Sequence, residues 1–169
     1  CLNAEVGGEP EVSDHIFDRV VIYSKTVAVP VRRIPEDPVI LSGKALFNKI
    51  DCSLCHTPSY VTGSSDIPAL SGQRIWPYTD LLLHDMGSDL SDQNPGSKAI
   101  HQEWRTAPLW GIGLAKQVTS YTGYLHDGRA RTIEEAILWH GGEAKDSRDS
   151  FMMLSQRERK ALIAFVSDL

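Results

Sequence analysis

The feature that most constrains this chain is the run Cys52-Ser53-Leu54-Cys55-His56, in which two cysteines flank two residues and a histidine follows directly. This C-x-x-C-H pattern is the attachment signature of a c-type haem. Two thiols on one turn can add to the two vinyl groups of a porphyrin, while the imidazole of the next residue binds the iron as proximal ligand. With three cysteines and six histidines in 169 residues, chance produces this pattern about 0.002 times per chain, so coincidence is a weak explanation.

Two other uses of a C-x-x-C pair are weaker. A zinc site needs four ligands, typically from a second close pair, whereas the later histidines are single and far apart: His84, His101, His126 and His140. A thioredoxin-like pair opens a helix directly after a strand, whereas this pair follows a helical pattern. A haemless dithiol or disulfide module nevertheless stays open as an alternative. Three cysteines leave one unpaired in any disulfide scheme, so a disulfide scaffold is not expected and Cys1 has no predicted role.

Composition indicates one soluble globular domain. The chain is 41% hydrophobic and 23% charged, which disfavours disorder. Its net charge is −5, and its scattered basic residues make nucleic acid a poor partner. The longest apolar runs, Leu81 to Leu83 and Ala161 to Val166, fall far short of the roughly 20 residues that span a bilayer. Because the chain starts with a cysteine, we expect it to be a fragment, and its compartment must be inferred from its chemistry.

The N-terminal part is expected to form one helix and a linker. Ser13 is a candidate N-cap for a helix whose apolar face is Ile16, Phe17, Val20 and Val21. The prolines between residues 30 and 38 favour an extended linker. We therefore predict that residues 1–38 are a helix and a proline-rich linker packed on a haem domain of residues 39–169.

The haem domain is expected to be mainly α. Ser42 is a candidate N-cap for a helix that leads into the C-x-x-C-H motif. Residues 57–113 are rich in glycine, proline, serine and aspartate and predict long loops, with a brief helical turn near residues 108–112. Thr132 caps a helix over residues 133–139, and Ser155 with Glu158 forms a capping box for a last helix. This order predicts a cytochrome c-like domain with irregular loops around a covalently attached haem.

Five longer segments strengthen this prediction: residues 43–47, 52–56, 78–87, 104–111 and 125–142. They closely resemble the C-terminal part of the bacterial di-haem oxidoreductases, some of which are labelled thiol oxidoreductases. That family is similar to the di-haem cytochrome c peroxidases. Its members carry two C-x-x-C-H motifs, whereas this chain carries one.

The resemblance implies a function. We expect a periplasmic or otherwise exported domain with one haem c, which passes single electrons between an upstream haem domain of the same full-length protein and a soluble redox partner. A peroxidase-like domain that reduces peroxide at an open iron is the alternative.

The sixth iron ligand separates these two functions. His140 lies at the end of the helix after Thr132, where the similar peroxidase domains hold a methionine or a tyrosine, and we predict His140 as the ligand opposite His56. Met86, a thioether in a loop, is the second candidate. A histidine at a helix end can also serve only to complement the helix dipole.

The remaining candidates surround the porphyrin. His126, Arg129, Arg74 and Arg105 are expected at the haem propionates, although each arginine could equally be a solvated surface residue. Four tryptophans could wall the haem, with Trp110 and Trp139 ranked before Trp76 and Trp104, although large aromatics are often simply core. Pro68 resembles the loop proline of small cytochromes c whose carbonyl holds the proximal imidazole.

Overall fold

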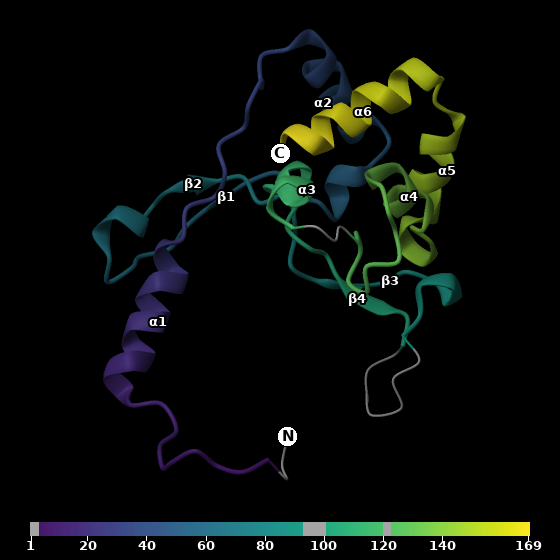
Figure 1. The fold of residues 1–169 in the computed structure, drawn as a ribbon. Helices are drawn as coiled ribbons and strands as arrows, with labels where there is room; N and C mark the ends of the chain where they lie inside the picture. The colour runs from purple at the N-terminus through teal and green to yellow at the C-terminus, as the bar shows by residue number, and fades with distance from the viewer. Residues whose placement is uncertain (1–3, 93–100, 120–122) are drawn as a thin grey trace. The chain divides into compact units, whose positions relative to one another are not determined.

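The computed structural model describes residues 4–92, 101–119 and 123–169 (Figure 1). By their internal contacts, residues 1–30 form one compact unit and residues 31–169 a second. This boundary falls earlier than the predicted one at residue 38. The first unit contains α1 (Asp14–Thr26), which begins directly after Ser13 as its pattern predicts, although the Ser13 side chain makes no capping hydrogen bond. No residue of α1 is buried.

The second unit is mainly helical, which confirms that part of the predicted fold class (Figure 1). Its helices are α2 (Pro38–Lys49), α3 (Ala115–Val118), α4 (Ile133–Leu138), α5 (Lys145–Met153) and α6 (Gln156–Asp168). Two small antiparallel sheets join β1 (Tyr60–Val61) to β2 (Arg74–Ile75) and β3 (Leu83–Asp85) to β4 (Glu103–Arg105). These strands have only two or three residues, too few for an alternating pattern to reveal them.

Helix α2 begins earlier than its predicted start at Ser42. The carboxylate of Asp37 accepts hydrogen bonds from the backbone N–H groups of Val39 and Ile40, and Pro38 occupies the first turn. Proline fits there because the first N–H groups of a helix have no partner within the helix. The proline that predicted the end of a linker therefore opens the helix.

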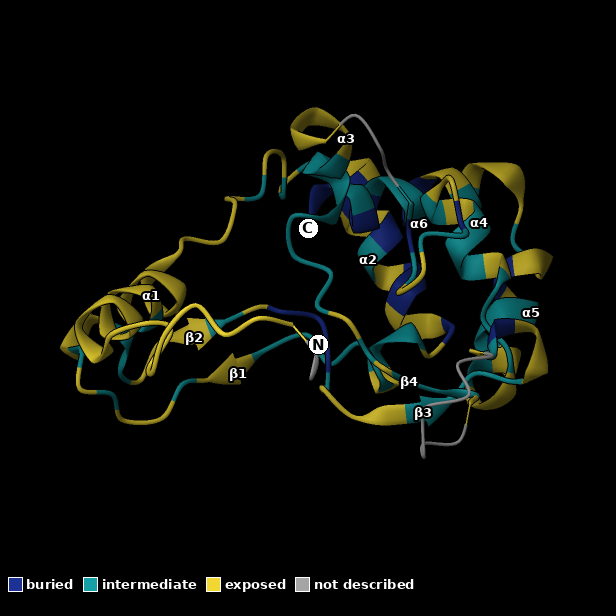
Figure 2. Cartoon of the chain, turned by 60° about the horizontal axis from the view of Figure 1, so that its bottom comes forward, coloured by how far each residue is buried: buried dark blue, intermediate teal, exposed yellow. Residues whose placement is uncertain are grey.

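The core of the second unit lies where α2 packs on α6 (Figure 2). Phe47 of α2 and Phe165 of α6 meet edge to face with ring centres 5.4 Å apart, and Tyr78 packs edge-on against both. At the contact between the helices, a Cβ atom on Gly43 would lie only 2.0 Å from the carbonyl oxygen of Ala161. The missing side chain of Gly43 therefore allows the two backbones to approach closely.

Replacing Gly43 by alanine is expected to destabilise the fold by about 2 kcal/mol, because the overpacking exceeds the gain of roughly 1 kcal/mol in helix propensity. Denaturant unfolding of the protein with its native cofactor content measures this loss. Gly63→Ala is the matched control, since a Cβ at Gly63 meets nothing within 4 Å. Equal stability of the two variants would contradict the predicted clash.

Asp168, at the end of α6, ties the segment after Pro30 to the second unit. Its buried carboxylate accepts hydrogen bonds from the backbone N–H groups of Arg33 and Ile34, at 3.0 and 2.9 Å, and from Nε of Arg32 at 2.8 Å. Burial alone would raise the pKa of this carboxyl, but these donors outweigh burial and lower the pKa. Residues that were predicted as linker thus form part of the second unit.

The helix ends show how local sequence determines local structure. The Thr132 side chain accepts a hydrogen bond from the Glu135 N–H and caps α4, and Ser155 and Glu158 form the predicted capping box of α6.

Helix α5 was not predicted from the sequence, because its residues are mostly polar and only Phe151 in it is buried. No helix among the described residues is long and apolar enough to cross a membrane.

Candidate functional site

The C-x-x-C-H motif directly follows α2. Asp51 leaves the helix in a left-handed conformation with φ of 66°, and Cys52–Leu54 then form one 3-10 turn. The backbone N–H of His56 donates to the carbonyl of Cys52 at 3.0 Å, which closes the motif into a compact loop. The apolar face of α2 and this reversal place Cys52 against the core and the His56 ring 6.2 Å from the ring of Phe47.

The His56 ring is oriented by one backbone carbonyl. Its Nδ1 lies 3.0 Å from the carbonyl oxygen of Tyr78 and donates to it, so Nε2 keeps its lone pair. Burial lowers the pKa of His56 to about 4, although the hydrogen bond to Tyr78 acts in the opposite direction. His56 is therefore neutral at pH 7, as a metal ligand must be.

The expectation for Pro68 is corrected by this contact. The carbonyl that accepts a hydrogen bond from the His56 ring belongs to Tyr78, whereas the carbonyl of Pro68 accepts one from the N–H of Ser71. Tyr78 is buried and carries a positive φ of 54°, whereas Pro68 is exposed. Sequence reasoning missed Tyr78 because a backbone acceptor leaves no signature in a side chain.

The His140 ring lies close to that of His56. His140 follows α4, and its Nδ1 donates to the carbonyl oxygen of Ala136 at 2.8 Å, so again Nε2 keeps its lone pair. Burial lowers the pKa of His140 as well. The centres of the two imidazole rings are 6.4 Å apart, with their planes at 43°.

This separation can be compared with the distance that one shared metal ion would impose. A transition metal lies about 2 Å from an imidazole nitrogen, and that nitrogen lies about 1 Å from its ring centre, so two imidazoles on opposite sides of one ion have centres about 6 Å apart. The observed 6.4 Å agrees with this value. The residues present therefore fit an iron between His56 and His140.

The two cysteines of the motif are free and half-buried. Burial raises the pKa of the Cys52 thiol to about 12 and also raises that of Cys55, to which the charges of Asp80 and Glu143 contribute. Reactive redox cysteines show the opposite shift, because the thiolate is the nucleophile.

Met86, the second candidate for the sixth ligand, lies beside the turn that follows His140. A Cβ atom on Gly141 would lie 2.7 Å from the Met86 carbonyl oxygen, and one on Gly142 would lie 2.1 Å from that of Asp85. Only glycines permit this close packing. The segments that carry the two candidate ligands are thus in contact, but the paired imidazole rings are those of His56 and His140.

Three charged residues beside Cys55 were not predicted as a group. His84 Nε2 lies 2.8 Å from Asp80 Oδ2, and His84 Nδ1 lies 2.8 Å from Glu143 Oε2 and 3.9 Å from Cys55 Sγ. The hydrogen bond to Glu143 is the main reason that the pKa of His84 is raised. Cys55, Asp80 and His84 have ligand atoms within 4.8 Å of one another, but a protonated imidazole between two carboxylates has no lone pair for a metal.

The expected propionate and wall residues form two separate groups. Arg129 lies over the Trp139 ring with its guanidinium carbon 5.1 Å from the ring centre, and it also pairs with Asp127. The exposed His126 stacks on Trp104 at 5.0 Å, and its Nε2 donates to the carbonyl of Arg105. These contacts use part of the donor capacity predicted for the propionates.

The other candidates are placed as follows. Arg74 and Arg105 are exposed in β2 and β4, Trp110 is half-buried before the 3-10 turn Ile112–Leu114, and Trp76 is about half exposed beneath the ammonium group of Lys44.

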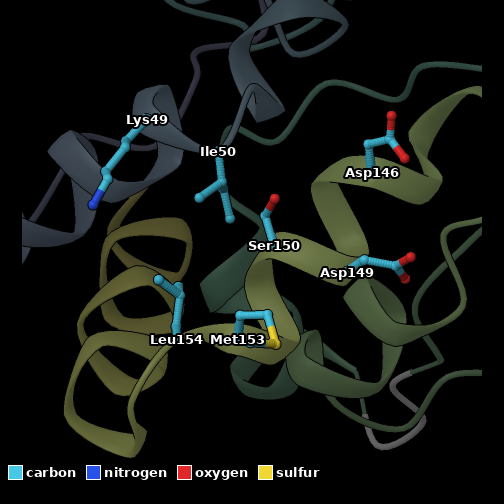
Figure 3. A pocket seen from close by; sticks show the side chains of 7 residues that line it. All are labelled: Lys49, Ile50, Asp146, Asp149, Ser150, Met153 and Leu154. Carbon is cyan, nitrogen blue, oxygen red and sulfur yellow. The ribbon is translucent and has the colours of Figure 1, made fainter.

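The described surface also contains an open pocket of about 550 Å³ between the end of α2 and α5 (Figure 3). It is lined by Lys49, Ile50, Asp146, Asp149, Ser150, Met153 and Leu154. None of these residues belongs to the predicted site, and Asp149 is already paired with Lys145 and Arg148. The pocket therefore plays no part in the candidate haem site.

A mainly helical unit with a C-x-x-C-H motif and a second half-buried imidazole near its histidine defines a candidate haem protein. The chain belongs to the di-haem oxidoreductase family, because the family model described as "di-haem oxidoreductase, putative peroxidase" matches residues 2–169. No curated protein and no solved structure matches the chain. The family description supports haem as the cofactor and oxidoreductase as the general role.

Proposed function

We propose that this chain is the electron-transfer domain of a di-haem oxidoreductase, with one haem c attached through Cys52 and Cys55 and with iron bound by His56 and His140. The observation that carries this proposal is the pair of neutral imidazoles with ring centres 6.4 Å apart. Each ring is held at Nδ1 by a backbone carbonyl, of Tyr78 or of Ala136. Such second contacts fix which nitrogen of a histidine is available to a metal.

Attachment would need no external oxidant or reductant. Cys52 and Cys55 would each hold the porphyrin by a thioether, formed when the S–H group adds across one vinyl C=C bond and its proton goes to the other vinyl carbon. Burial raises the pKa of both thiols, which favours the protonated form that adds to a vinyl group. Maturation of this kind takes place outside the bacterial cytoplasm, so we propose a periplasmic or otherwise exported protein.

Two histidine ligands favour electron transfer. A bound haem c supplies reversible exchange of one electron at a time. If both His56 and His140 bind the iron, they would leave no position on it for water or peroxide. We propose an upstream haem domain of the same full-length protein and a soluble redox protein as the two partners, since this chain carries one C-x-x-C-H motif and the family is di-haem.

Residues near His140 are proposed to complete the surroundings of the haem. Trp139 precedes His140, is half-buried and lies beneath the Arg129 guanidinium. The flat face of Trp139 would exclude water from the porphyrin, and Arg129 would offset the propionate charge with the donors that its bonds to Asp127 and to the Asp89 carbonyl leave free.

The competing function is reduction of peroxide at an open iron, which the family description "putative peroxidase" favours. It requires that His140 not occupy the sixth position. The short distance of 6.4 Å between the two ring centres argues against an open iron in the resting protein.

The wild-type protein, produced with a c-type maturation system, is therefore expected to contain one low-spin haem that takes up one electron per chain, to bind carbon monoxide only slowly when reduced and to show negligible turnover of hydrogen peroxide. Optical spectra, redox titration and a peroxide assay measure these properties. Rapid carbon monoxide binding together with rapid peroxide turnover would support the peroxidase function instead.

A further inference from the structure

The side chains of Asp80, His84 and Glu143 form a chain of hydrogen bonds that we call the clasp. Asp80 Oδ2 and Glu143 Oε2 each lie 2.8 Å from a different nitrogen of His84. The His84 and Asp80 side chains are only 16% and 12% exposed, whereas that of Glu143 is 57% exposed. Asp80 and His84 are only four residues apart, whereas Glu143 lies 59 residues after His84, so the contact between His84 and Glu143 is the tertiary part of the clasp.

One end of the clasp belongs to the segment that orients His56. Asp80 lies two residues after Tyr78, whose carbonyl accepts from His56 Nδ1. Between them, Thr79 is buried and donates from Oγ1 to the carbonyl of Thr106 at 2.6 Å. Asp80 is therefore attached to a segment held firmly in place by its neighbours.

The other end belongs to the segment that carries His140. Glu143 lies three residues after His140, in the 3-10 turn Gly142–Ala144. Its second oxygen, Oε1, accepts a hydrogen bond from the backbone N–H of Asp85 at 3.1 Å. Glu143 therefore holds both His84 and the end of β3, where Gly141 and Gly142 pack against the backbone.

We propose that His84 is a positioning residue that holds His140 opposite His56 by joining the two ligand-bearing segments through Asp80 and Glu143. This inference rests on the proposed ligation by His56 and His140. His84 does not touch the iron in this proposal. Without the hydrogen bonds of the clasp, the turn after α4 would move more freely and His140 would leave the iron more often. His56 would stay bound, because the Tyr78 carbonyl still holds its ring.

The test uses the haem-loaded protein with three substitutions: Glu143→Gln, Glu143→Ala and His84→Ala. Carbon monoxide binding to the reduced protein and the high-spin fraction of the oxidised protein report an open sixth position. Glu143→Ala is expected to raise the carbon monoxide association rate severalfold and His84→Ala by about tenfold, because a pair with one exposed partner contributes less than the whole network. Glu143→Gln, which keeps the shape and one hydrogen bond, is expected to restore much of the wild-type behaviour.

His101→Gln is the matched control, since His101 is exposed and lies outside the clasp. Denaturant unfolding is measured in parallel, because a purely structural role would lower stability without changing the spectrum or the ligand rate. Because the Glu143 side chain is exposed, its variants are expected to fold and take up haem even if His84→Ala does not.

The wild-type spectrum and the variants decide separate points. A wild-type protein without low-spin bis-histidine haem would overturn both the proposed ligation and the clasp. A bis-histidine wild type whose Glu143→Ala variant keeps the same low-spin spectrum and the same carbon monoxide rate would overturn the clasp alone. A larger high-spin fraction in Glu143→Ala, with no change in His101→Gln, would support it.

Discussion

Replacing both Cys52 and Cys55 by alanine is expected to abolish covalent haem completely in protein made with a c-type maturation system. Without either sulfur, no bond can join the chain to the porphyrin vinyl groups, and any haem that remains is held only by ligation and packing. Haem staining after denaturing electrophoresis measures the loss, because denaturation releases every haem that is not bonded to the chain. Retained staining in the double variant would overturn covalent attachment at this motif.

The single variants and a third cysteine sharpen this experiment. Cys52→Ala or Cys55→Ala is expected to leave one thioether, which the pyridine haemochrome spectrum distinguishes from two because one vinyl group remains conjugated to the ring. Cys1→Ala is the control and should stain as strongly as the wild type, since Cys1 lies outside the C-x-x-C-H motif. A wild-type chain that never stains under these conditions would favour the haemless dithiol alternative.

Replacing His140 by alanine is expected to have the second large effect: it should open the sixth position and convert the haem from low spin to high spin. The wild type should lack a sulfur-to-iron charge-transfer band and should have a low reduction potential for a cytochrome c, because two imidazoles favour ferric iron more than an imidazole and a thioether do. His140→Ala should then bind cyanide when oxidised and carbon monoxide when reduced. Optical and electron paramagnetic resonance spectra detect both changes.

Met86→Ala is the matched variant for this experiment, since Met86 is the other candidate ligand and lies against Gly141. It should keep the wild-type spectrum and remain closed to both added ligands. If Met86→Ala alone becomes high spin while His140→Ala keeps the wild-type spectrum, the sixth ligand is Met86 and the bis-histidine assignment is wrong.

Several features of this protein could be predicted from the sequence because local residues determine them. The capping box of α6 and the Thr132 cap of α4 involve residues three positions apart, so the sequence contains both partners. Helix α1 likewise begins where Ser13 predicts. Helix α2 starts before the predicted position because Pro38, which the pattern assigns to a linker, is favourable in the first turn of a helix.

The candidate site was predictable only in part. The spacing of Cys52, Cys55 and His56 is itself the signature of haem attachment, so these residues are recognisable without a fold. The sequence predicts His140 as the sixth ligand, from its place at the end of a helix, with Met86 as the second candidate. The segments that carry the two residues are in contact, and the measured ring distance from His56 is that of His140.

The sequence by itself thus determined the attachment motif, the helix caps and the family, all of which depend on residues close together in the chain or on recognisable segments. Only the tertiary structure decided that the His56 ring is held by Tyr78 instead of Pro68, that its ring centre lies 6.4 Å from that of His140, and that His84 joins Asp80 to Glu143. The physical reason is that these contacts depend on how loops pack on the α2 and α6 core. A backbone carbonyl makes the contact with His56, and the packing of Gly141 and Gly142 is possible only because these residues have no Cβ atom. Neither feature leaves a pattern in the order of the side chains.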